Sequence, residues 1–185
     1  MDLSLNSQIK FNVAYIKLCT KTEGPLNRCC IWFQGCNLDC KGCCNKDLHA
    51  LIPNHIVEFD KLVEIVKEAK EQFGIEGITL SGGEPSLQKG LVDFNNTIHE
   101  LGLGIIMFSG KKKETLNPEL VNSVDLLIDG PFIESELDTD RVLLGSKNKN
   151  LTFITDRYVA ESDYFNNPVA IEEVTAEDYI FINGD

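Results

Sequence analysis

The sequence predicts an α/β protein, built as a partial, open β/α barrel with a parallel sheet of about five or six strands. Short apolar runs alternate along the chain with amphipathic helical patterns. The runs are apolar without interruption, which is typical of strands covered on both faces of a parallel sheet. The chain has 185 residues, fewer than the ~250 of a complete (β/α)8 barrel. We therefore expect the barrel to be open.

Each expected element has its own pattern. Residues 59–73 carry apolar side chains at helical spacing, and Gly74 follows as a stop. A second helix is expected over residues 86–101 and a short one over 114–122. Strands are expected at residues 29–33, 75–81, 104–108, 124–128 and 151–154. We expect one domain, with its core over residues 1–157 and an acidic C-terminal extension over 158–185 that docks a partner, covers substrate or forms a solvated edge.

Composition excludes several classes of partner. The formal net charge of −12 argues against binding to nucleic acid or to an anionic membrane. No apolar run approaches the ~20 residues of a transmembrane helix, and residues 1–5 lack the pattern of a signal peptide. We therefore expect a cytoplasmic protein. The basic run at residues 111–113 is interpreted as a solvated turn or as a contact for an acidic electron donor or for an anion.

Six of the seven cysteines lie between residues 29 and 44. Among them, Cys36, Cys40 and Cys43 form a C-x3-C-x2-C pattern directly after an expected strand. Three thiolates on one loop suit a [4Fe–4S] cluster with one iron left open, because such a cluster normally takes four cysteines. Zinc is the alternative, with a fourth ligand from Cys44, His49 or His55. The spacing alone leaves both open.

Four polar segments follow expected strands. They are the cysteine loop, Gly82-Gly83-Glu84, Ser109 and Asp129. Ligands of open α/β sheets bind beyond the carboxyl ends of the strands. We therefore expect these segments to meet at one rim of the sheet.

The cysteine pattern and the Gly82–Pro85 string behind the next strand together resemble the radical S-adenosylmethionine (SAM) superfamily. Further strings resemble the activating enzymes of anaerobic ribonucleotide reductase: Gly24-Pro25, Arg28, residues 34–37, 43–45, 128–132 and 145–148. Two positions depart from that family. Cys44 stands where an aromatic residue or histidine is usual, and Ser109-Gly110-Lys111 stands where a Thr-Gly-Tyr-like string is common.

The resemblance implies a set of roles. Cys36, Cys40 and Cys43 would bind the [4Fe–4S] cluster, and the methionyl amine and carboxylate of SAM would bind its open iron. The Gly82-Gly83-Glu84 segment would contact the methionyl amine. The remaining expected SAM contacts are Asn45, Ser109, Asp129, Ser146 and Asn148. Arg28 is expected either to help place the cluster or a carboxylate, or to form a surface ion pair.

The resemblance also implies a reaction. Reduced flavodoxin or ferredoxin would supply an electron, and a 5′-deoxyadenosyl radical formed from SAM would abstract hydrogen, most simply from a glycine of a large glycyl-radical enzyme. The alternatives are a radical SAM enzyme acting on a peptide, nucleoside or other small substrate, and a zinc-binding module without catalysis. Buried packing is expected for at least one of Cys29 and Cys30, whereas Cys19 and Cys44 receive no role.

Overall fold

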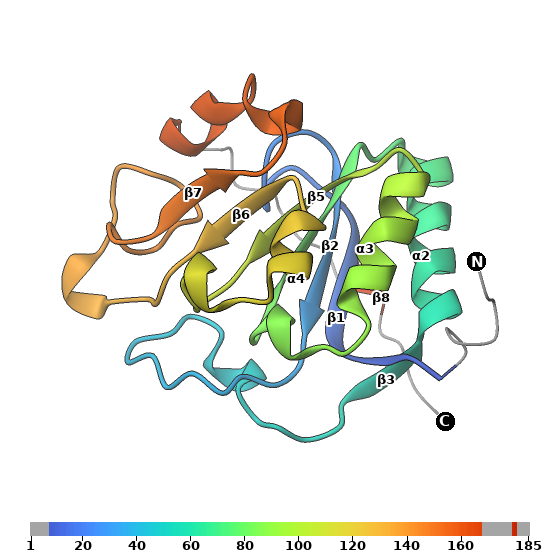
Figure 1. Ribbon diagram of the computed structural model, residues 1–185, viewed down its shortest axis with the longest axis horizontal. Coiled ribbons are helices and arrows are strands. Elements are labelled where there is room, and N and C mark those ends of the chain that lie inside the picture. Colours follow the sequence, from blue (N-terminus) through green and yellow to red (C-terminus); the bar gives the residue numbers. More distant parts are fainter. Residues whose placement is uncertain (1–7, 168–178, 181–185) are drawn as a thin grey trace.

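The computed structural model describes residues 8–167 and 179–180, which form one mixed sheet with helices against it (Figure 1). The strand order is β3-β1-β2-β4-β5-β6-β7, and β8 also pairs with β1. The strands are β1 (Lys10–Thr20), β2 (Arg28–Phe33), β3 (His55–Glu58), β4 (Gly77–Gly82), β5 (Gly104–Phe108), β6 (Leu126–Asp129), β7 (Asn150–Phe153) and β8 (Tyr179–Ile180). The sheet does not close on itself, as predicted for a partial barrel.

The parallel part of the sheet is smaller than predicted. β2, β4, β5 and β6 pair in parallel, which makes four strands rather than five or six. β7 was expected to join them but runs antiparallel to β6, with Asn150 opposite Asp129. The chain returns from the end of β6 to β7 through residues 130–149 without a crossover helix, and a parallel connection needs such a crossover.

One long strand, β1, is absent from the sequence prediction. It pairs with β2 on one side, and with β3 and β8 on the other, always antiparallel. Its pairing with β2 shifts register between Val13 and Tyr15 and again between Lys17 and Thr20. Such bulges break the alternation of buried and exposed residues by which a strand is recognised in sequence.

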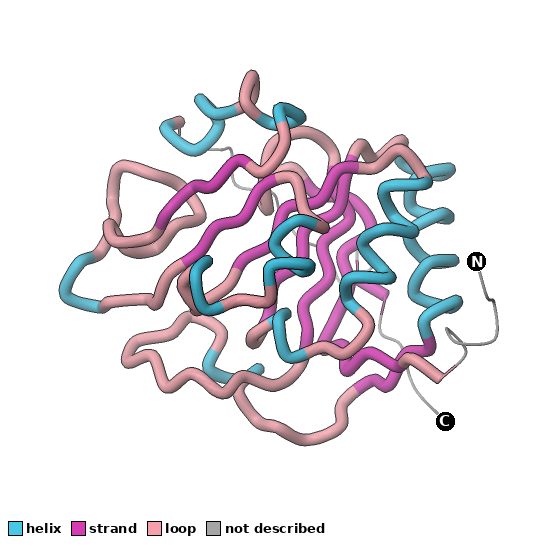
Figure 2. Tube along the Cα trace, viewed as in Figure 1, coloured by secondary structure: helices cyan, strands magenta, loops and turns pink. Residues whose placement is uncertain are grey.

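Three helices cover one face of the sheet: α2 (Phe59–Phe73), α3 (Leu91–Glu100) and α4 (Pro118–Asn122) (Figures 1 and 2). α2 has the predicted bounds and ends at Gly74, whose left-handed φ of 61° suits glycine. α3 begins five residues later than predicted. The preceding residues form a short 3-10 helix (Pro85–Leu87), and Gly90 leads into α3 with a φ of 78°.

Both faces of the parallel strands are buried. Ile31, Ile78 and Ile105 belong to the core that the three helices cover. On the opposite face, two smaller clusters are formed by Trp32 with Cys30 and by Ile106 with Leu126. Between these two clusters, β4 presents Thr79 and Ser81, which are also buried. A polar strip therefore divides the apolar inner face of the sheet.

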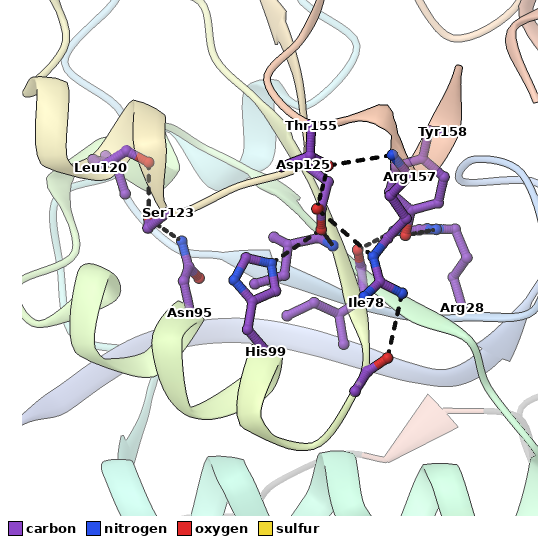
Figure 3. A network of polar contacts seen from close by, with 12 residues as sticks. Arg28, Ile78, Asn95, His99, Leu120, Ser123, Asp125, Thr155, Arg157 and Tyr158 are labelled. Atoms are coloured by element: carbon purple, nitrogen blue, oxygen red, sulfur yellow. Dashed lines mark hydrogen bonds and ion pairs between the residues drawn. The ribbon is translucent and has the colours of Figure 1, made fainter. Parts of the chain in front are cut away.

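Arg28 lies at the start of β2, at the opposite end of that strand from the cysteine loop, and is fully buried (Figure 3). Its guanidinium donates to Thr79 Oγ1 at 2.7 Å, to Tyr158 Oη at 2.8 Å and to the carbonyl of Ile78. Both expectations for Arg28 are wrong: it neither reaches the cysteine loop nor lies on the surface. It ties the amino end of the sheet to the segment after β7.

Part of the expected C-terminal extension packs into the core. Tyr158 and Phe165 are fully buried and belong to the inner-face cluster of Ile106 and Leu126. The acidic residues Glu172, Glu173 and Glu177 lie outside the described residues. No helix in the described part of the chain is long and apolar enough to cross a membrane.

Candidate iron–sulfur and SAM site

The cysteine loop leaves β2 and is fastened to its own return segment. Gly35 N–H donates to the carbonyl of Leu48 at 2.8 Å, and Cys36 N–H donates to that of His49 at 3.1 Å. Within the loop, Cys43 N–H donates to the carbonyl of Cys40 at 3.3 Å. Cys36, Cys40 and Cys43 are half-buried, and Cys44 is exposed. The backbone thus holds the three thiols of the pattern in a partly sheltered loop.

The Gly82-Gly83-Glu84 segment lies directly against this loop. Glu84 N–H donates to the carbonyl of Gly35 at 2.9 Å, and Asn45 Nδ2 donates to the carbonyl of Gly82 at 3.1 Å. A Cβ at Gly83 would come within 2.2 Å of the Gly35 carbonyl oxygen. Glycine at position 83 is therefore required for the two segments to approach so closely.

Glu84 is fully buried, and its carboxylate points into the rim. It accepts from Ser109 Oγ at 2.9 Å, from Gly110 N–H at 2.9 Å and from Ser86 N–H at 3.1 Å. These three donors compensate for the loss of water around the carboxylate. Glu84 and Ser109 thus join the ends of β4 and β5, and their side chains are already paired with each other.

Asp129 and Ser146 are also buried and engaged. Asp129 accepts from Thr152 Oγ1 at 3.1 Å and from Lys113 N–H at 3.0 Å. Ser146 Oγ accepts from Ile133 N–H at 3.3 Å. Asn148 Nδ2 donates to the carbonyl of Pro131 at 2.8 Å, whereas its Oδ1 is buried and has no hydrogen-bond partner.

The Cys36 thiol is influenced by burial and by the groups around it. Burial raises the pKa of Cys36, a backbone hydrogen bond with Leu38 opposes this, and the charges of Glu84, Cys40 and Cys43 add to the increase. In residues 8–167 and 179–180, no three or more His, Cys, Asp or Glu side chains converge on a point where a single metal ion would bind. A [4Fe–4S] cluster normally takes four cysteines, one for each iron, so the three thiols of the pattern would leave one iron open.

Two neighbours of the site were not recognised in the sequence. A Cβ at Gly110 would come within 2.4 Å of a methyl group of Leu38, so the segment after β5 touches the cysteine loop. Lys149 is the second: burial lowers the pKa of its ammonium, and the charges of Cys40, Glu84, Cys44 and Cys43 oppose that decrease. In the sequence, Lys149 could have been recognised by its position just before β7, because polar side chains are expected at the ends of strands.

A family profile described as "4Fe-4S single cluster domain" matches residues 22–152. The anaerobic ribonucleoside-triphosphate reductase-activating protein of Escherichia coli K12 is 28% identical over 138 residues, which are 69% of this chain and 88% of that protein. The protein of the same name from Haemophilus influenzae is 30% identical over the same shares. That of phage T4 is 26% identical over 144 residues, or 75% of this chain and 91% of the relative.

Among solved structures, the chain resembles QueE from Escherichia coli with a TM-score of 0.51 and 10% sequence identity. The match covers 69% of this chain and 73% of QueE, and at this identity it supports the fold. The comparisons confirm the resemblance drawn from the sequence, and with it the [4Fe–4S] cluster and SAM. They give no support to a zinc-binding module.

Proposed function

Because this chain belongs to the family of 4Fe–4S single cluster domains, we propose that it is a radical SAM activase that installs a glycyl radical on an anaerobic ribonucleotide reductase. The observation that carries the proposal is the match of residues 22–152 to that family, together with relatives named as activating proteins of anaerobic ribonucleoside-triphosphate reductase. Each of those relatives is matched over 88% of its length.

Cys36, Cys40 and Cys43 are the residues that would hold the cluster. When bound, the cluster supplies one electron that cleaves SAM to methionine and a 5′-deoxyadenosyl radical, which takes a hydrogen atom from glycine and becomes 5′-deoxyadenosine. The protein's task is to position groups and to exclude water. A reduced flavodoxin or ferredoxin is the proposed source of the electron.

The residues at the rim of the sheet would form the binding site for SAM. The backbone of Gly82, Gly83 and Glu84 lines the methionyl side, and Asn45 holds this segment against the cysteine loop through Gly82. Ser109 fixes the Glu84 carboxylate.

Further along the rim, Asp129 anchors the loop at Lys113 and the strand at Thr152. Ser146 holds the segment after β6 through Ile133 N–H. Asn148 Oδ1, which lacks a partner, accepts a hydrogen bond from the ligand. All of these contacts to SAM are part of the proposal.

The experiment is anaerobic reconstitution with iron and sulfide, followed by reaction with SAM, dithionite and the anaerobic reductase of the same organism. We expect about four irons per chain, equimolar methionine and 5′-deoxyadenosine, and a glycyl radical in the electron paramagnetic resonance (EPR) spectrum of the reductase. A reductase labelled with deuterated glycine should transfer deuterium to 5′-deoxyadenosine.

Two variants control this experiment. Cys40→Ala should abolish both the cluster and SAM cleavage, whereas Cys19→Ala, a cysteine of β1 outside the loop, should retain both. SAM cleavage without a glycyl radical would refute the activase and favour a peptide, nucleoside or small-molecule substrate. Absence of an iron–sulfur cluster in the wild type would refute the radical SAM assignment.

A further inference from the structure

Two cysteines outside the cysteine loop lie opposite each other on neighbouring strands. β1 and β2 run antiparallel (Figure 1), and their register shifts between Lys17 and Thr20 of β1. Over this shift β1 advances by three residues and β2 by two, so Leu18 and Cys19 lie opposite the single residue Cys29. Two residues opposite one is the arrangement of a β-bulge.

The two thiols belong to the same face of the sheet. Cys29 is fully buried in the core that the three helices cover, and the half-buried Cys19 packs against the same core. The next residue, Cys30, lies on the opposite face in the cluster of Trp32. Opposite residues of antiparallel strands have Cα atoms about 4.5–5.5 Å apart, and a disulfide spans about 4.4–6.8 Å between Cα atoms. The register therefore places Cys19 and Cys29, which are both thiols in this structure, within disulfide range.

This pair lies at the other end of β2 from the cysteine loop. Cys29 is the second residue of β2, and the loop begins after the last residue of the strand, Phe33 (Figure 1). At about 3.3 Å per residue, the strand carries Phe33 roughly 13 Å away from Cys29. Cysteines whose Cα atoms are more than about 7 Å apart do not pair without movement of the backbone. The fold therefore separates this pair from the thiols that would hold the cluster.

The two thiols differ in their reactivity. Burial raises the pKa of Cys29 to about 12, so this thiol stays protonated and is shielded from solvent. Cys19 is partly exposed and is the one of the two that an oxidant in solution can reach. Oxidation begins at the accessible thiolate, and Cys29 is then the neighbouring thiol that completes the disulfide.

We propose that Cys19 and Cys29 form a redox-sensitive pair that closes to a disulfide when the protein meets hydrogen peroxide. The Cys19 thiolate attacks one peroxide oxygen and the O–O bond breaks, which gives a sulfenic acid and a hydroxide that is protonated to water. The Cys29 sulfur then attacks the sulfenic sulfur, the S–O bond breaks, and the hydroxyl group leaves as water with the proton of Cys29. The two sulfurs lose two electrons in all, and the peroxide gains them.

The closed disulfide would fasten β1 to the start of β2 across the bulge. This modification site goes beyond the proposed function, since it needs neither the cluster nor SAM. Its test uses the apoprotein, treated with hydrogen peroxide under native conditions. The remaining thiols are blocked with N-ethylmaleimide, and the tryptic peptides are analysed by mass spectrometry without a reductant. We expect the peptide of residues 18–21 to be linked to that of residues 29–41.

Two variants assign the link, because the second peptide carries four cysteines. Cys29→Ala should abolish it, whereas Cys30→Ala should retain it. Cys30 is the matched control, since it is equally buried but lies on the opposite face. The oxidised wild type should melt about 5–10 °C above the reduced protein, because a disulfide constrains the unfolded chain. Dithiothreitol should reverse this increase in Tm, and Cys29→Ala should not show it.

Other outcomes overturn the proposal. A link that persists in Cys29→Ala means that another thiol is the partner of Cys19. Sulfenic or sulfonic acid at Cys19 without a link means that Cys29 is out of its reach. An unmodified Cys19 after peroxide treatment means that the oxidant does not reach this thiol.

Discussion

Replacing Gly83 by alanine should separate the cysteine loop from the Gly82-Gly83-Glu84 segment. The new Cβ would lie 2.2 Å from the Gly35 carbonyl oxygen and 3.0 Å from that of Leu48, whereas ordinary contact begins at 3.4 Å. The contacting atoms are backbone, so no side-chain rotation relieves the overlap. The two segments must move apart by roughly 1 Å, as in the overpacking of other close-packed interiors.

The magnitude follows from two contributions. Overpacking costs about 1–3 kcal/mol, and lengthening the 2.9 Å hydrogen bond from Glu84 N–H to Gly35 costs about 1 kcal/mol. The free energy of unfolding should therefore fall by roughly 2–4 kcal/mol. For a chain of this size, this lowers Tm by about 4–16 °C. The iron content after reconstitution should fall as well, because the displaced loop carries Cys36.

Thermal melting of the apoprotein and iron analysis of the reconstituted protein measure the two effects. Gly102→Ala is the control for adding a Cβ without overlap: Gly102, unlike Gly83, has a left-handed φ, of 78°, and a Cβ there meets nothing within 4 Å. It should cost only the backbone strain, about 1–2 kcal/mol, with full iron content. A Gly83→Ala protein that melts with the control and binds iron normally would refute the steric reasoning.

Three further predictions concern the rest of the fold. Tyr158→Phe removes the hydroxyl that accepts a hydrogen bond from buried Arg28 at 2.8 Å. The guanidinium of Arg28 would then have an unpaired donor, and the free energy of unfolding measured in urea should fall by about 1–3 kcal/mol. No change in this free energy would mean that water replaces the hydroxyl. Burial opposes ionisation of Asp125, but hydrogen bonds from His99, Thr155 and Ile105 N–H outweigh it and hold the pKa of Asp125 below its ordinary value. Its contribution to stability is thus present above the unfolded pKa of about 3.9 and is lost as the pH falls through the folded pKa. Asp125→Asn should therefore show a flatter loss of stability in acid, and a curve parallel to that of the wild type would contradict this. Removing the iron with a chelator should leave the far-ultraviolet circular dichroism unchanged, because the cysteine loop lies on the rim rather than in the core; unfolding would place the cluster among the determinants of the fold.

The elements that were predicted well from the sequence are those with a regular pattern of buried residues. α2 packs one stripe against the sheet, and β2 and β4 are buried along their whole length. β1 escaped prediction because its bulges interrupt the alternation, and β3 is only four residues long. The start of α3 was misplaced because Pro85 begins a separate 3-10 turn. Hydrophobic patterns record burial, and they do not record bulges or turns.

The meeting of the cysteine loop with Gly82-Gly83-Glu84 followed from strand order alone. The partners of the individual side chains did not. Glu84 is turned inward onto Ser109, and Asp129 is hydrogen-bonded to Thr152, because buried carboxylates take the nearest donors that the folded backbone offers. Arg28 carries a charge that suggested the surface or the site, yet it is buried at the opposite end of β2. The hydrogen-bond partners of such a side chain include residues far away in the sequence, such as Tyr158 for Arg28. No local sequence pattern indicates these partners.

The pairing of β8 with the middle of β1 has a consequence for how this protein behaves when its C-terminus is cut. Tyr179 and Ile180 occupy the outer edge of β1 opposite Lys17 and Ile16. A chain ending before Tyr179 would leave backbone donors and acceptors of that edge open to pairing with another molecule. Truncation at this point should therefore promote self-association, so Tyr179 and Ile180 protect the edge of β1 against aggregation as well as extending the sheet.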